Sequence, residues 1–364
     1  GGAGIVRAVE IEVRGSGPTG GWPEPGCPCA SCRRGGAEGE RRAPFHLVVD
    51  GELELPGGSV PAGYRVRELA GGWDVTGPDG ARLLAGVRPA APAEARYDAV
   101  LLDLGRDPSQ LGLLRARGAV TEGTLVLAGF AGHQVRSGRE LARRCRMWRA
   151  TLPRDGDTFT VPGPPAGSPA GSPARPPAGP ERPSWRALVL GGSGSGKSAE
   201  AELRVAAEPA VTYVATGKAP GPEDAEWAAR VGAHRERRPA WWRTVETGSE
   251  AASLSRELTS ARGAVLVDSV TTWLAAAMDE CGAWDGAPAA AGRLATLVDE
   301  VVTAWRHAPA HVVAVSDEVG LGVVPETRAG RMYRDELGRL NQRLAADADE
   351  FTVMMAGRPL VTAD

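Results

Sequence analysis

The chain has 364 residues, a formal net charge of -3 and a pI near 6.1, so its length fits two domains better than one. The charge argues against a general nucleic-acid-binding protein, because such proteins need a basic face to displace counterions. Hydrophobic residues make up 42% of the sequence, which is enough for ordinary buried cores. The sequence shows neither a signal-peptide pattern nor an apolar run of about 20 residues. It therefore predicts a soluble cytoplasmic protein without membrane insertion.

A stretch rich in proline, glycine and serine divides the sequence. Residues 162–183 read PGPPAGSPAGSPARPPAGPERP and show no apolar periodicity. This composition is typical of a semi-extended linker. We therefore expect an N-terminal domain over 1–161, the linker over 162–183 and a second domain over 184–364.

The region before the linker has short and irregular elements. Strands are predicted at 9–13 and 100–104, short hairpin strands over 51–81, and a helix over 139–148. The mixture indicates an α+β domain, and we interpret it as an αββα arrangement.

Three of the five cysteines, Cys27, Cys29 and Cys32, lie within six residues. This is not the spacing of a secreted disulfide framework, whereas three thiolates so close together can form one face of a tetrahedral zinc site. Residues 20–34 resemble the opening of metallo-β-lactamase-fold phosphodiesterases, and the resemblance implies a structural zinc held by these cysteines. The alternative is a set of free thiols in a loop that once bound metal. The candidates for a fourth ligand are His46, His133 and Cys145.

The H-x-H-x-D-H motif of that fold is missing from the sequence. At the expected position, residues 129–133 read GFAGH, and one histidine cannot build a two-metal hydrolase site. Asp103, near the end of the predicted strand 100–104, resembles the aspartate of the L-L-x-D pattern of the fold and is expected to be structural. We therefore expect a degenerate, hydrolytically inactive domain, whose role stays open between assembly, regulation and substrate capture.

Apolar strands alternate with helices after the linker. Strands are predicted at 187–190, 211–215, 264–268, 311–316 and 351–355, and helices at 198–207, 224–235 and 331–346. Uninterrupted apolar strands between helices indicate a parallel sheet covered on both faces. The second domain is therefore predicted to be an α/β domain.

The loop after the first of these strands matches the phosphate-binding pattern G-x-x-x-x-G-K-[ST], between a predicted strand and a predicted helix as the motif requires. Its residues are Gly191, Gly192, Ser193, Gly194, Ser195, Gly196, Lys197 and Ser198. Glycines let backbone N–H groups surround phosphate oxygens, and the helix N-terminus adds partial positive charge. Lys197 is expected to reach the β- and γ-phosphates, and Ser198 to bind Mg²⁺ together with Asp268 at a strand end. The motif indicates a P-loop NTPase-type sheet, but many different reactions use it.

A histidine within an arginine cluster narrows the chemistry. His234 lies near the end of a predicted helix, beside Arg235, Arg237 and Arg238. An imidazole can attack an α-phosphorus and carry a nucleotidyl group, while arginines balance phosphate charge. For a lone histidine, a solvated side chain on a basic helix would be the commoner interpretation.

Further motifs follow the P-loop in a fixed order. They are Ala215-Thr216, HRERRP at 234–239 with Trp242, Thr244 and Glu246, DSVTTWL at 268–274, DEVGLGVVPE at 317–326, and RLNQRL at 339–344. Residues 186–359 thereby resemble the bifunctional adenosylcobinamide kinase/adenosylcobinamide-phosphate guanylyltransferase family. The resemblance implies an enzyme of cobalamin biosynthesis.

Two reactions are implied by this resemblance. ATP or GTP phosphorylates adenosylcobinamide; GTP then guanylylates His234 with release of pyrophosphate, and GMP passes on to give adenosylcobinamide-GDP. A homo-oligomer such as a trimer is also implied. The implied nucleotide contacts are the P-loop with catalytic Lys197, Ala215, Thr216, Gly217, Arg235, Glu236, Arg237, Arg238, Glu246 and Asp268.

Two departures from the family pattern keep alternatives open. Asp317 stands where the family has Asn and adds negative charge near the phosphates, and Ser193-Gly194 replaces an Ala-Arg pair. The alternatives are an enzyme that retains one half-reaction and a non-catalytic GTP-binding regulator. Trp241, Trp242 and Trp273 are expected in the core rather than on a corrinoid-binding surface.

Overall fold

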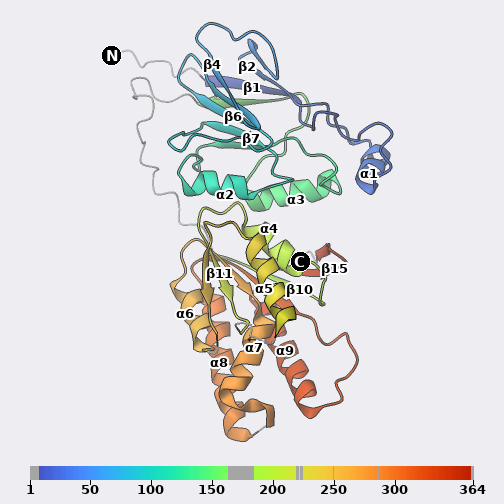
Figure 1. Cartoon of the computed structure of the whole chain (residues 1–364), viewed down its shortest axis with the longest axis vertical. Coiled ribbons are helices and arrows are strands. Elements are labelled where there is room, and N and C mark those ends of the chain that lie inside the picture. The colour runs from blue at the N-terminus through green and yellow to red at the C-terminus, as the bar shows by residue number, and fades with distance from the viewer. Residues whose placement is uncertain are drawn as a thin grey trace. The chain divides into compact units, whose positions relative to one another are not determined.

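A computed structural model describes residues 8–162, 184–218, 221, 224–248, 250–285 and 287–361. The chain divides into two compact units, Gly1–Pro180 and Glu181–Asp364 (Figure 1). Apart from its first position, the predicted linker lies outside the described residues. Within the described part, no helix is both long and apolar enough to cross a bilayer.

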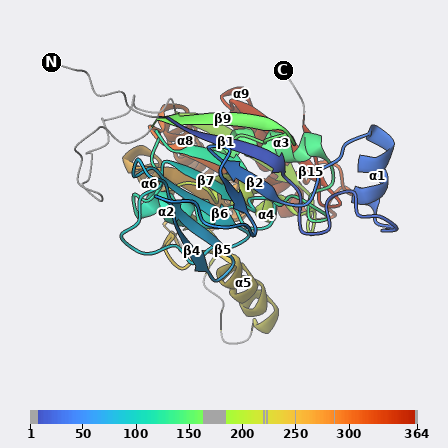
Figure 2. The same ribbon diagram turned by 90° about the horizontal axis from the view of Figure 1, so that it is seen from above.

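Two sheets form the first unit. One has the order β3-β2-β1-β9 with antiparallel pairs, and Figure 2 shows β9, β1 and β2 side by side. Its strands are β1 (Ala8–Gly15), β2 (His46–Val49), β3 (Leu53–Leu55) and β9 (Asp157–Pro162). The other has the order β4-β5-β6-β7-β8 and becomes parallel after β6. Its strands are β4 (Arg65–Leu69), β5 (Gly72–Thr76), β6 (Arg82–Gly86), β7 (Ala99–Leu102) and β8 (Leu125–Ala128).

A hydrophobic core lies between these sheets, where Ile11 and Leu47 of one share a cluster with Leu83 and Leu101 of the other. Helices α2 (Ser109–Ala116) and α3 (Gly138–Trp148) lie on the far side of the second sheet (Figure 1), which leaves β7 buried on both faces. Helix α1 (Ala30–Glu38) follows the cysteine segment.

Helices were expected on both outer faces of the N-terminal domain, and this part of the αββα prediction is wrong for the described residues. Alternate residues of β1, including Glu10 and Arg14, are exposed rather than covered by a helix. Two sheets and one helical layer make three layers here. The polar alternation in β1 explains the difference, because it leaves no apolar outer face for a helix to bury.

One seven-stranded sheet organises the second unit, in the order β12-β11-β13-β14-β10-β15-β16. All pairs are parallel except β15 with β16. The strands are β10 (Trp185–Gly191), β11 (Val211–Ala215), β12 (Arg243–Glu246), β13 (Ala264–Asp268), β14 (His311–Asp317), β15 (Glu350–Met355) and β16 (Arg358–Val361). The helical elements are α4 (Lys197–Val205), α5 (Ala225–Arg237), α6 (Ala252–Ser260), α7 (Val270–Cys281), the short 3-10 helix Ala283–Asp285, α8 (Pro288–His307) and α9 (Arg328–Ala346).

Both faces of this sheet are covered, as the continuous apolar strands predict. Leu188 and Val265 pack with the cluster that holds α6 to α9, whereas Val189 and Leu266 pack with α4. Trp273 is 1% exposed and Trp242 is 7% exposed, and Trp241 packs against the α4 cluster. The three tryptophans therefore serve packing.

Strand order fixes where the polar residues meet. Gly191 at the end of β10 is in register with Asp317 at the end of β14, and Ala215 of β11 with Asp268 of β13. The carboxyl ends of parallel strands share one edge of the sheet, which is the usual place for a ligand in such folds. The P-loop, Asp268 and Asp317 accordingly meet at this edge.

Candidate active site

The P-loop is shaped by its glycines. Gly194 and Gly196 have φ values of 69° and 91°, in the left-handed region that favours glycine. A Cβ added to Gly191 would lie 2.4 Å from the Ser195 hydroxyl and 2.8 Å from the Met354 carbonyl oxygen. Helix α4 begins directly after Gly196, so its first N–H groups face the loop as an anion-binding terminus.

A cavity of about 570 Å³ opens beside this loop. Its wall contains these residues predicted from the sequence: Ser193, Gly194, Ser195, Gly196, Lys197, Ser198, Ala215, Gly217, His234, Arg235, Arg237, Arg238, Glu246 and Asp268. One continuous pocket thus joins the P-loop to the histidine and arginine segment.

Four predicted residues, all within the described ranges, lie outside the cavity wall: Gly191, Gly192, Thr216 and Glu236. Thr216 is buried, and its hydroxyl accepts the backbone N–H of Ser269 at 2.9 Å. Gly192 contributes its carbonyl oxygen, which accepts a hydrogen bond from Lys197 Nζ at 3.1 Å. Glu236 is exposed on α5. These residues support or flank the cavity rather than line it.

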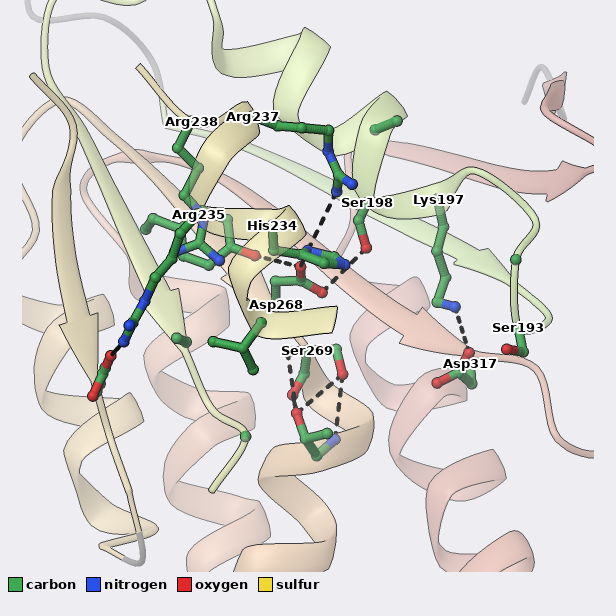
Figure 3. A pocket seen from close by; sticks show the side chains of 18 of the residues that line it. Ser193, Lys197, Ser198, His234, Arg235, Arg237, Arg238, Asp268, Ser269 and Asp317 are labelled. Atoms are coloured by element: carbon green, nitrogen blue, oxygen red, sulfur yellow. Dashed lines mark hydrogen bonds and ion pairs between the residues drawn. The ribbon is translucent and has the colours of Figure 1, made fainter. Parts of the chain in front are cut away.

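The Asp268 carboxylate contacts several other side chains of the pocket (Figure 3). Its Oδ1 accepts from the Ser198 hydroxyl at 3.4 Å, and its Oδ2 lies 3.3 Å from His234 Nδ1. The same Oδ2 also accepts from the Tyr213 hydroxyl. Burial alone would raise the pKa of Asp268, but hydrogen bonds from His234 and Tyr213 and nearby positive charge hold it below its ordinary value. Burial raises the pKa of Tyr213, so this hydroxyl is a donor.

The arginines of α5 and the turn after it have protein partners. Arg237 donates to Glu202 through two nitrogens at 3.2 Å, and the Arg238 guanidinium lies 3.3 Å from the centre of the Tyr213 ring. Arg235 forms a more exposed ion pair with Glu246. These contacts hold the histidine segment against the P-loop side of the sheet.

Lys197 forms an ion pair with Asp317, with 2.6 Å between Nζ and Oδ1 (Figure 3). The backbone of Asp317 is fixed on both sides, because its N–H donates to the Thr271 hydroxyl at 2.8 Å and its carbonyl accepts from Asn341 Nδ2 at 3.0 Å. The motif that contains Asn341 therefore has a structural task here. The position that departs from the family pattern therefore lies directly beside the P-loop lysine.

Sequence reasoning missed Tyr213, Lys218, Ser269 and Thr272, which also line the cavity. A signal existed for Tyr213, since strand alternation places it on the same face as Val211 and Ala215. Ser269 and Thr272 form the capping box of α7, which the serine and threonine spacing could have indicated.

In the N-terminal unit, His133 lies beside the three clustered cysteines. Its Nδ1 is 3.5 Å from Cys27 Sγ, 3.3 Å from Cys29 Sγ and 3.5 Å from Cys32 Sγ. Its Nε2 faces Glu24 at 2.7 Å. Among the described residues, the ligand atoms of the three cysteines and His133 all lie within 4.8 Å of one another.

Neither of the other two candidates for the fourth ligand joins this group. His46 faces Glu54 at 3.4 Å, and Cys145 is buried in α3, where burial raises its pKa to about 12. In the cluster, the Cys32 N–H and His133 lower the pKa of Cys29 to about 6, whereas burial raises that of Cys32 to about 11.

The C-terminal unit is a P-loop nucleotide-binding domain of mixed α/β type, because strand, glycine loop, lysine and helix follow in order and a carboxylate ends β13. The sequence signature described as "Cobinamide kinase / cobinamide phosphate guanyltransferase" matches residues 187–362. With the relatives below, this shows that the chain belongs to that family.

Three relatives match the same half of the chain. The chain is 38% identical to the bifunctional adenosylcobalamin biosynthesis protein CobU of Salmonella typhimurium over 176 residues, which are 47% of this chain and 95% of that protein. It is 37% identical to CobU of Escherichia coli, with the same coverage. It is 40% identical to the bifunctional adenosylcobalamin biosynthesis protein CobP of Pseudomonas aeruginosa over 179 residues, which are 48% of this chain and 95% of that protein.

Proposed function

We propose that the C-terminal unit phosphorylates adenosylcobinamide with ATP or GTP and then transfers GMP from GTP to the product through a guanylyl-histidine. The observation that carries this proposal is the position of His234. Its imidazole shares the carboxylate of Asp268 with the P-loop serine, inside one cavity. A nucleophile is thereby held next to the place where a triphosphate binds.

The charged and hydroxyl side chains around the P-loop and His234 have different tasks in this proposal. Backbone N–H groups of the P-loop and Lys197 bind the phosphates, and Ser198 with Asp268 fits Mg²⁺, since both offer oxygen ligands on one side of the cavity. The metal, when bound, supplies charge neutralisation for the triphosphate. Arg235, Arg237 and Arg238 balance charge on the transferred group, and Glu246 accepts N–H groups of guanine. For the last contact, Arg235 has to release Glu246.

Guanylylation is tested with GTP labelled at the α-phosphate. The protein should acquire a covalent label that is acid-labile and alkali-stable, as a phosphoramidate is. His234→Ala should abolish the label, whereas His307→Ala, which changes an exposed histidine on α8, should retain it. A protein that binds GTP with Mg²⁺ and never becomes labelled would be a kinase or a GTP-binding regulator instead.

The phosphorylation step needs its own measurement, because an enzyme with one half-reaction is the alternative. Incubation with adenosylcobinamide and γ-labelled ATP or GTP should give labelled adenosylcobinamide phosphate, and His234→Ala should leave this product in place. Loss of phosphorylation in the intact chain, with guanylylation retained, would favour the single-reaction alternative. The Asp317 contact with Lys197 is the feature that motivates this comparison.

For the N-terminal unit we propose a structural zinc on Cys27, Cys29, Cys32 and His133. Tetrahedral zinc with bonds of about 2.3 Å to sulfur and about 2.05 Å to nitrogen places those atoms about 3.6 Å apart. The observed sulfur to nitrogen distances of 3.3–3.5 Å fit this value. Glu24 on the opposite ring nitrogen is the kind of carboxylate partner that orients metal-bound histidines.

We also propose that this unit is a hydrolytically inactive relative of the metallo-β-lactamase-fold phosphodiesterases. The histidine of the GFAGH segment is directed at the cysteines, so it is not available for a catalytic centre. Phosphodiesterase assays on the full chain would contradict this if turnover appeared with added metal. A homo-oligomer such as a trimer is proposed too, to be tested by light scattering in solution.

A further inference from the structure

We infer that Asp268 orients His234 for guanylyl transfer by holding the proton of Nδ1, so that Nε2 is the atom that attacks the α-phosphorus. This inference rests on the proposed guanylyltransferase function. It assigns Asp268 a second task in addition to the proposed binding of Mg²⁺. Asp268 is thus a positioning residue for the nucleophile.

The two oxygens of Asp268 face different partners. Oδ1 accepts from the Ser198 hydroxyl at 3.4 Å, on the side of the P-loop. Oδ2 lies 3.3 Å from His234 Nδ1 (Figure 3). The same oxygen accepts from the Tyr213 hydroxyl. The side chains of His234 and Asp268 are only 24% and 11% exposed. One carboxylate can therefore serve a cation through one oxygen and the imidazole through the other.

The groups around Nδ1 of His234 indicate which ring nitrogen carries the proton. Arg237 Nη2 also lies 3.3 Å from Nδ1 and could donate to an unprotonated nitrogen. Nη2 carries two hydrogens, so Arg237 can keep its 3.2 Å bond to Glu202 whichever ring nitrogen of His234 is protonated. Asp268 Oδ2, by contrast, can only accept from the ring. The Asp268 Oδ2 and the His234 Nδ1 are 3.3 Å apart. A carboxylate oxygen and a nitrogen lone pair repel each other at that separation, so the carboxylate favours a proton on Nδ1. In the neutral ring the lone pair is then on Nε2.

Tyr213 holds the carboxylate in this orientation. Its hydroxyl donates to the same Oδ2 that faces the imidazole, and the Arg238 guanidinium lies over its ring at 3.3 Å from the centre. Rotation of the Asp268 carboxylate would break the Tyr213 and His234 contacts together. The support therefore comes from β11 and from the turn after α5.

Guanylyl transfer consists of two displacements at the α-phosphorus. The Nε2 lone pair forms a bond to the α-phosphorus of GTP, the bond from that phosphorus to the bridging oxygen breaks, and pyrophosphate leaves with the electron pair. Nδ1–H stays hydrogen-bonded to Asp268, whose charge stabilises the cationic guanylyl-imidazole. In the second step a phosphate oxygen of adenosylcobinamide phosphate attacks the same phosphorus, and the electron pair of the broken P–N bond returns to Nε2.

The first test is independent of nucleotide and metal. Nitrogen NMR of the full chain labelled with ¹⁵N-histidine, at a pH where the ring is neutral, identifies the tautomer; His234→Ala assigns the signal. We expect the Nδ1–H tautomer in the natural sequence and its loss or mixture in Asp268→Asn. Asp317→Asn, which changes a carboxylate of the same cavity that pairs with Lys197, should keep the Nδ1–H tautomer. An Nε2–H ring in the natural sequence, or an unchanged tautomer in Asp268→Asn, would overturn the inference.

The second test uses the labelled intermediate. NMR of the guanylylated protein should show phosphorus bonded to Nε2, and a bond to Nδ1 would overturn the inference. In Asp268→Asn, guanylylation should fall by about 10²-fold or more. Raising the Mg²⁺ concentration should restore phosphorylation more than guanylylation, which should stay low. Equal recovery of both reactions would show that Asp268 acts through the metal alone. If the natural sequence forms no intermediate, the proposed function fails, while the tautomer measurement still decides the orientation.

Discussion

Lys197 of the P-loop and Asp317 at the end of β14 form an ion pair, with 2.6 Å between Nζ and Oδ1 and with both side chains at most one quarter exposed. The contact occupies the ammonium group that binds the phosphates of the nucleotide in the proposed function. A triphosphate therefore has to compete with Asp317 for this lysine.

Asp317→Asn should strengthen nucleotide binding, because the amide carries no charge to compete with the phosphates. We expect the Kd of GTP with Mg²⁺, measured by calorimetry, to fall about tenfold, equivalent to about 1.4 kcal/mol. Asp347→Asn is the control, since that carboxylate pairs with Arg306 and does not line the cavity formed by the described residues. Weaker binding in Asp317→Asn would show instead that the carboxylate assists the nucleotide.

Tyr213→Phe should slow guanylylation while leaving GTP binding largely intact. The substitution removes the hydroxyl that donates to Asp268 and keeps the ring under Arg238. Loss of one hydrogen bond to a charged group predicts about a tenfold decrease in the single-turnover labelling rate. Tyr64→Phe, whose hydroxyl donates to Asp50 in the other unit, serves as the control. An unchanged rate in Tyr213→Phe would contradict the positioning role of the hydroxyl.

Zinc content should depend on the cysteine cluster and on pH. Purified protein should contain about one zinc per chain by mass spectrometry, and Cys29→Ser or His133→Ala should lower it, while Cys145→Ser should not. The metal has to displace the proton of Cys32, whose pKa is raised to about 11, so affinity should increase with pH. Below pH 6 it should fall further, because Cys29 with its pKa of about 6 and His133 with its raised pKa become protonated too. Zinc retained in His133→Ala at low pH would exclude this site.

A buried ion network should stabilise the C-terminal unit next to the P-loop. Arg204 on α4 donates to Glu200 at 3.2 Å, and to Glu350 at 2.9 Å and Thr352 at 2.8 Å on β15. Arg204→Ala removes a buried charge and its contacts with all three residues, and should cost about 3–5 kcal/mol in the free energy of unfolding by urea. Arg306→Ala, which breaks a pair in which the arginine is 55% exposed, should cost at most about 1 kcal/mol. Equal losses would contradict the network.

Local patterns predicted much of the C-terminal fold. The strands expected at 211–215 and 264–268 are confirmed as β11 and β13 with the same bounds, because each is a continuous apolar run between helices. The edge strand β12 was missed, since none of its four residues is buried and it carries no apolar pattern. Helix α8 was also missed, although Pro288 at its first turn is a typical helix start.

Some residues of the candidate site could also be predicted from local patterns, whereas others could not. The P-loop, Asp268 and His234 could be predicted because their chemistry is written in short contiguous motifs. The contact of Lys197 with Asp317 and that of Tyr213 with Asp268 depend on the strand order β11-β13-β14-β10, which brings distant strand ends together. No local periodicity encodes that order, so these contacts required the folded structure.

Formation of a guanylyl group on His234 decides whether the proposed guanylyltransferase function is correct. The full chain, incubated with α-labelled GTP and Mg²⁺ and digested, should yield a labelled peptide whose phosphoramidate maps to this histidine. Addition of adenosylcobinamide phosphate should remove the label and release adenosylcobinamide-GDP. A protein that binds GTP yet carries no label on His234, or carries it on another residue, would not be a guanylyltransferase of the proposed kind.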